Sequence, residues 1–125
     1  MLAFCTLLVL QGCISIEIGS RTGQKVLNHV VLCWLKDPGN AEHRRQIVEA
    51  TKSFGEIPGV IKAQAGQAVP GERGIVDDSF DVGILIVVPD RRRLIEYLEH
   101  PIHQEAKKEI LLPLVEKIVV YDFQE

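Results

Sequence analysis

The chain has 125 residues, of which 46% are hydrophobic and 25% are charged, and its formal net charge at pH 7 is −3. This length favours a single domain, and the apolar content is enough for a core. The slightly acidic balance gives no indication of a nucleic-acid-binding surface. The basic run Arg91-Arg92-Arg93 is typical of a solvated helical turn, because acidic residues surround it.

The first thirteen residues differ in character from the rest of the chain. Residues 1–10 are almost wholly apolar, which is too short for a membrane span but typical of the apolar region of a signal peptide. Leu10-Gln11-Gly12-Cys13 follows, and this pattern resembles the bacterial lipobox, in which the chain is cleaved before the cysteine and a lipid is attached to its thiol. The sequence therefore predicts a signal peptide over residues 1–12, a lipidated Cys13 and a tether over residues 13–25.

This interpretation predicts a location in the bacterial cell envelope, with a lipid on Cys13 anchoring the protein to a membrane and the domain facing the periplasm. One feature departs from a typical signal peptide, because no Lys or Arg precedes the apolar run. The alternative is an ordinary buried N-terminal strand, which would leave the protein in the cytoplasm. Cys33 stands alone in an apolar segment, so no disulfide framework is expected.

Hydrophobic periodicity and turn residues divide residues 26–124 into strands and helices. The first strand is apolar on both sides, which is typical of a strand that is covered on both faces. Asn40 is a candidate N-cap for the helix that follows this strand. Near the end of the chain, Pro101 begins a new helix and Pro113 should bend or end it. The predicted strands cover residues 27–36, 61–69, 80–88 and 118–123, and the predicted helices cover residues 41–54, 90–99 and 101–115.

The order β-α-β-β-α-β predicts an α+β domain with the ferredoxin-like βαββαβ plait, in which a four-stranded antiparallel sheet carries helices on one face. In the first strand, His29 lies on one face and Val30 and Trp34 on the other, and both faces are mainly apolar. Helices cover only one face, and an uncovered apolar face of this size indicates a partner. The sequence therefore predicts a homodimer through the sheet face opposite the helices.

The segment from Tyr97 to His103 gathers one phenol and two imidazoles at a helix junction. Pro101 cannot continue the upstream helix but suits the first position of a new one, so His103 is expected in a first helical turn. The positive end of the helix dipole disfavours a charged imidazole there, and a neutral imidazole is what a general base requires. The same residues could instead form a packed junction in which His100 and His103 bond to the backbone.

Five short motifs occur in a fixed order along the chain. They resemble the stress-responsive A/B barrel domain, also called the dimeric α/β-barrel (Dabb) domain, over about residues 26–124. The resemblance implies a ferredoxin-like protomer whose sheet pairs with that of a second copy in a barrel. The motifs are His29-Val30-Val31-Leu32, Ile57-Pro58-Gly59-Val60, Asp81-Val82, Tyr97-Leu98-x-His100-Pro101-x-His103 and Val119-Val120-Tyr121-Asp122-Phe123.

The resemblance also has chemical implications, because the family includes a plant polyketide cyclase with a pocket between its sheet and its helices. By that resemblance, His103 matches the catalytic base, Tyr97 its phenol partner and His29 a histidine of the first strand. A further pocket histidine of the cyclase falls at Val82 here, and this departure weakens the analogy. We expect a ligand pocket formed by His29, Tyr97, His100 and His103.

Two functions are compatible with the sequence. The first is a dimeric module that binds a small apolar ligand or has a structural role, and the absent histidine at Val82 favours it. The second is a cofactor-free, cyclase-like enzyme that uses His103 as a base, with Tyr97 assisting, on a small apolar carbonyl compound. No cofactor is indicated. No metal site is expected, because the histidines have no carboxylate or thiolate at a convincing spacing.

Overall fold

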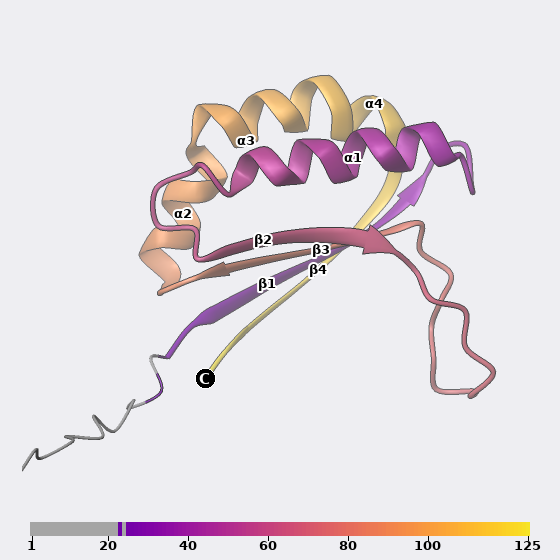
Figure 1. Cartoon of the computed structure of the whole chain (residues 1–125), viewed down its shortest axis with the longest axis horizontal. Helices are drawn as coiled ribbons and strands as arrows, with labels where there is room; N and C mark the ends of the chain where they lie inside the picture. The colour runs from indigo at the N-terminus through magenta and orange to yellow at the C-terminus, as the bar shows by residue number, and fades with distance from the viewer. Residues whose placement is uncertain (1–22, 24) are drawn as a thin grey trace, which may run out of the picture.

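The computed structural model describes residue 23 and residues 25–125. The predicted signal peptide, Cys13 and most of the predicted tether therefore lie outside the described residues. Figure 1 shows a sheet with all of the helices layered on one of its faces. In chain order the elements are β1 (Leu27–Leu35), α1 (Ala41–Phe54), β2 (Lys62–Gln67), β3 (Val82–Val88), α2 (Arg91–Glu99), α3 (Pro101–Ala106), the π-helical turn η1 (Lys107–Leu111), α4 (Leu112–Leu114) and β4 (Val115–Gln124).

The four strands form one antiparallel sheet in the order β2-β3-β1-β4. β1 pairs with β3 on one side and with β4 on the other, so β2 and β4 are the two edges. The predicted ferredoxin-like βαββαβ plait with helices on one face is thereby confirmed. Within residues 25–125, no helix has the length and apolar content needed to cross a bilayer.

The last helical region differs from the single helix predicted over residues 101–115. It is divided into α3, η1 and α4, and β4 already begins at Val115 instead of residue 118. Pro113 explains the division, since it lacks the N–H that an α-helix directs to the carbonyl four residues earlier. β4 begins early because the chain leaves the helix beside the end of β1, where Val115 pairs with Leu35 beyond a shift in register.

The main core lies between the sheet and the helices. Alternate residues of β1 and β3 face the helices and are buried, and the inward face of α1 carries Ile47, Thr51 and Phe54. Full burial of one large apolar side chain stabilises a fold by roughly 1.5–3 kcal/mol. This layer therefore holds the helices over the sheet and fixes the position of the corner between α2 and α3.

Asp81 ties the end of β1 to the start of β3. Its carboxylate accepts hydrogen bonds from the backbone N–H groups of Leu35 at 2.9 Å and Gly39 at 2.8 Å, and its own N–H donates to the carbonyl of Cys33 at 2.9 Å. Hydrogen bonds to a charged acceptor are stronger than neutral ones. The Asp81-Val82 motif thus has a structural role, which is to close the end of the sheet at the turn after β1.

No helix covers the other face of the sheet (Figure 1). This face carries exposed apolar side chains. Tyr121 pairs with Val30 in the ladder and therefore lies on this face, as does Phe123 two residues further along β4. Their side chains are 59% and 56% exposed. Large aromatic side chains in such positions leave apolar surface in contact with water, which is the feature that predicted a partner.

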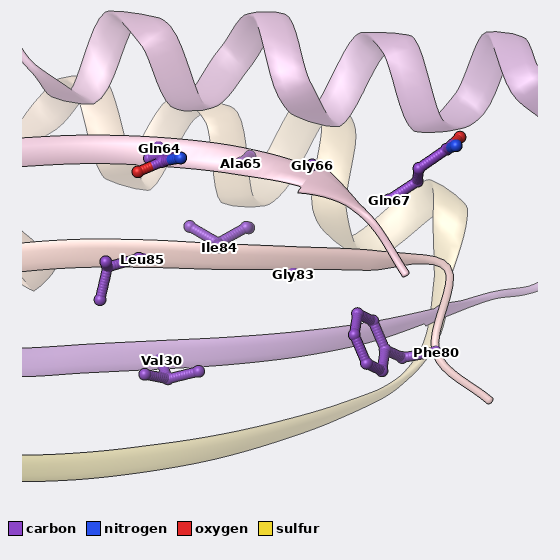
Figure 2. A pocket seen from close by; sticks show the side chains of 9 residues that line it. All are labelled: Val30, Gln64, Ala65, Gly66, Gln67, Phe80, Gly83, Ile84 and Leu85. Carbon is purple, nitrogen blue, oxygen red and sulfur yellow. The ribbon is translucent and has the colours of Figure 1, made fainter. Parts of the chain in front are cut away.

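A hollow of about 320 Å³ lies on the sheet at the ends of β2 and β3. Gly66 and Gly83 are directly paired there, so neither strand contributes a side chain at that position. Figure 2 shows that Val30 and Leu85 project away from the helices, whereas Ile84 points toward them. A Cβ added at Gly66 would meet no atom within 4 Å, so the space above this glycine is open.

Candidate functional site

A cavity of about 200 Å³ lies on the other side of the sheet, beneath the helices. Every layer of the fold contributes to its walls, which are mainly apolar. Its polar groups come from four residues: His29 on β1, Tyr97 on α2, His103 on α3 and Lys107 on η1. Three of the four predicted pocket residues therefore meet in one cavity.

His100 does not line this cavity, in contrast to the expectation from the sequence. It ends α2 and is the N-cap of α3, where its Nδ1 accepts a hydrogen bond from the backbone N–H of Ile102 at 3.2 Å. Pro101 occupies the first position of α3, which suits a residue without an N–H. The imidazole of His100 is thus engaged by a backbone N–H of the first turn of α3, and its role is to stabilise the corner.

His103 lies one turn further along and faces the cavity. Its Nδ1 lies 2.9 Å from the carbonyl oxygen of Leu98. A carbonyl can only accept, so Nδ1 carries the hydrogen and Nε2 of the neutral ring keeps a free lone pair. Burial lowers the pKa of His103, and the positive charge of Lys107 lowers it further, against the opposing effect of the bond to Leu98. His103 is therefore a neutral imidazole at neutral pH, which a general base needs to be.

Tyr97 is buried against the three other aromatic groups of the site. Its ring centroid lies 4.7 Å from that of His103, 5.7 Å from that of Phe54 and 6.0 Å from that of His29. Burial raises the pKa of the Tyr97 phenol well above its ordinary value, so the hydroxyl stays protonated. Since its hydroxyl has no hydrogen-bond partner among the described residues, Tyr97 can donate to a ligand oxygen in the cavity.

His29 is held by a partner that the sequence did not indicate. Its Nδ1 lies 2.6 Å from Oδ1 of Asp122, which is directly opposite in the β1–β4 ladder. The carboxylate accepts, so Nδ1 of His29 carries the hydrogen and Nε2 is left available. A signal for Asp122 exists in the sequence, because it follows Ile118 and Val120 at the alternate positions that face the helices.

The arrangement combines two imidazoles of fixed orientation with one protonated phenol in an apolar enclosure. Such a set can bind a ligand oxygen and can take up or release a proton, because each imidazole presents one nitrogen that is free of bonds to the protein. The position of the cyclase's further histidine is occupied by Val82, which is fully buried in the core. It therefore contributes no polar group to the cavity.

The fold and the cavity together define a ferredoxin-like α+β domain with a ligand-sized space between sheet and helices. Residues 27–125 match the family model described as the stress responsive A/B barrel domain, Dabb. Because this match covers most of the chain, the protein belongs to the stress responsive A/B barrel domain family. A comparison with curated protein sequences gives no match.

Several solved structures have a similar fold. A Dabb family protein from Mesorhizobium loti is 24% identical, with a TM-score of 0.64 over 80% of this chain and 96% of that one. A dimeric protein of unknown function from Bacteroides fragilis is 20% identical, with a TM-score of 0.66. The match covers 80% of this chain and 96% of that chain. A hydroxynitrile lyase from Passiflora edulis is 19% identical, with a TM-score of 0.69. The match covers 82% of this chain and 94% of that chain. At these identities the likeness establishes the fold alone.

Proposed function

We propose that this protein binds a small, mainly apolar molecule in the cavity between α2, α3 and the sheet. The observation that carries this proposal is the cavity of about 200 Å³ with four polar residues and otherwise apolar walls. An apolar cavity of roughly 150 Å³ accommodates benzene, so the ligand is expected to be a molecule of about that size with one polar substituent. The polar groups of the cavity would orient that substituent by hydrogen bonds.

Filling the cavity should abolish binding. Val120 lines the cavity from β4 and is 45% exposed, so a larger side chain can enter there without overpacking the core. Val120→Phe is expected to weaken the binding of benzamide, a neutral probe, at least about tenfold, as measured by isothermal titration calorimetry. The matched control is Val119→Phe, whose side chain lies on the other face of the same strand. Equal affinities of the two variants would contradict the proposed location of the site.

A second candidate function, proton transfer to or from a small carbonyl compound, rests on the state of His103. A neutral imidazole with a free Nε2 can remove a proton from the carbon next to a carbonyl, and the hydroxyl of Tyr97 can donate to the carbonyl oxygen. The ring centroids of these residues are 4.7 Å apart, so one ligand can contact both. The hydroxynitrile lyase among the similar structures is compatible with such chemistry but supports only the fold.

This candidate predicts exchange of the α-protons of a small ketone such as acetophenone in heavy water, followed by NMR. His103→Gln should lower the rate by roughly 10²–10⁴-fold, whereas His43→Gln, on α1 outside the cavity, should not change it. The rate should fall as pH decreases through the pKa of His103. Because burial lowers that pKa, activity should persist to lower pH than for free imidazole. A rate equal to the buffer background would exclude this function.

We also propose that the protein is a homodimer in which two sheets pack through the face opposite the helices. The exposed aromatic side chains of β4 and the hollow at Gly66 and Gly83 on the same sheet support this arrangement. The similar structure from Bacteroides fragilis is described as dimeric, which is compatible with it. In a two-fold dimer each copy would present both the aromatic edge and the hollow to the other.

Gly66→Leu tests this interface. The added side chain meets no atom within 4 Å at its Cβ in the protomer, so the fold should persist while the hollow is filled. We expect the dissociation constant of the dimer to rise at least about tenfold in analytical ultracentrifugation, because the inserted leucine occupies space that the partner needs. Gly74→Leu, in the loop between β2 and β3 with equally open space, is the control. A monomeric native protein would contradict the dimer itself.

We propose, finally, that a lipid on Cys13 anchors the protein in the bacterial cell envelope. The support is the Leu-x-Gly-Cys pattern after an apolar run, and Cys13 lies outside the described residues. Cys13→Ser should move the protein from the membrane fraction to the soluble fraction and leave the precursor uncleaved. Cys5→Ser, inside the predicted signal peptide, should change neither. Unaltered fractionation of the Cys13 variant would favour the alternative of a buried N-terminal strand.

A further inference from the structure

The π-helical turn η1 contributes one charged side chain, Lys107, to the lining of the cavity. Lys107, Leu111 and Leu112 all line the cavity, although in a regular α-helix a residue five positions on from Lys107 would point away from it. The backbone N–H of Leu112 donates to the carbonyl of Lys107, which is the i→i−5 bond of a π-turn. The wider turn places residues four and five positions apart on one side, and π-turns are frequent at functional sites.

Lys107 carries the one fixed charge among the described residues that line this cavity. It forms no ion pair or hydrogen bond with another described side chain, whereas Arg45, Lys52 and Arg93 each pair with a glutamate. The carboxylate of Asp122 cannot balance the charge from within the cavity, because it is bound to His29 and lines a separate hollow next to Leu27 and Arg91. Lys107 therefore adds an uncompensated positive charge to the lining of the cavity.

The ammonium also lies close enough to influence the other groups of the site. After burial, its positive charge is one of the causes that keep the pKa of His103 low. A lysine can lay its apolar stem along the cavity wall while its ammonium stays in water at the rim. Lys107 therefore suits a ligand whose apolar part is enclosed and whose charged end reaches the opening.

We propose that the ligand of this cavity is an apolar monoanion, such as a small aromatic or aliphatic carboxylate, whose charged group is bound by the ammonium of Lys107. This inference rests on the proposed binding function and adds the class of ligand to it. The apolar body occupies the space next to Tyr97 and His103, and the carboxylate lies at the mouth. A cation would be repelled by Lys107, and a neutral molecule of the same shape would lose the charge-assisted hydrogen bond.

Benzoate and benzamide separate the effect of charge from that of shape, because they have nearly the same size and differ in charge. Isothermal titration calorimetry on the full chain, at mildly alkaline pH and low salt, should give benzoate an advantage of about three- to tenfold. Lys107→Met keeps the apolar stem and should abolish this advantage of benzoate over benzamide. Lys107→Arg should restore it. Lys108→Met removes the adjacent exposed charge, which does not line the cavity, and should preserve it.

The possible results separate the monoanion proposal from the binding function on which it rests. If Lys107→Met keeps the benzoate advantage, or if the native protein binds both probes equally, the monoanion proposal is overturned while binding in the cavity stands. If the native protein binds neither probe, the binding function fails and the monoanion proposal fails with it. The benzoate advantage should also shrink as salt is added, because Lys107 is solvent-exposed and its charge is screened. Thermal unfolding of each variant checks that the fold is intact.

Discussion

Two prolines delimit the segment on which the site depends. Pro101 cannot continue α2, so the chain turns at His100 and the next helix brings His103 back over the carbonyl of Leu98. Pro113 cannot supply the hydrogen bond that would end a regular α-helix, and the residues before it widen into η1. Between the two prolines the helical segment leaves the helix-facing side of β4 partly uncovered, since Ile118 and Val120 are 43% and 45% exposed. The cavity occupies the space that this arrangement leaves.

The two imidazoles of the cavity are held by different acceptors with the same result. A backbone carbonyl binds Nδ1 of His103, and the carboxylate of Asp122 binds Nδ1 of His29. In each case Nε2 of the ring is left without a bond to the protein, while the phenol of Tyr97 stays protonated because burial disfavours the phenolate. Polar groups that are fixed in orientation and free on one side are the usual means by which an apolar cavity orients a ligand.

One face of the sheet lines the cavity, and the opposite face carries the proposed interface. His29 and Val31 on β1 line the cavity, and Val30 between them lines the hollow on the other side. Likewise Ile84 points to the helices while Leu85 projects away from them (Figure 2). Because strand residues alternate between faces, neighbouring residues along one strand belong to different sites. The position of either site is therefore tied to the register of β1 with β3 and β4.

Much of the fold follows from local patterns. The elements and their order can be predicted from the alternation of apolar residues in β1 and β3, from the N-caps at Asn40 and Asp90, and from the break at Pro101. Six elements in this order have one common topology, the ferredoxin-like plait. The short motifs around His29 and from Tyr97 to His103 indicate the family and name three cavity residues. These features depend on neighbours in the chain, so they can be read from a single sequence.

Other features required the tertiary structure. Asp122 is 93 residues from His29, and only the register of β4 against β1 makes them partners. Gly66 and Gly83 create a hollow because β2 and β3 pair them directly. The π-turn lets Leu112 line the cavity on the same side as Lys107, and His100 accepts a hydrogen bond from the backbone N–H of Ile102. Both features depend on how the helical segment packs over the sheet. The sequence by itself thus determined the fold and named three of the residues that line the cavity. The contacts that decide its chemistry join distant residues, and register and packing alone establish them.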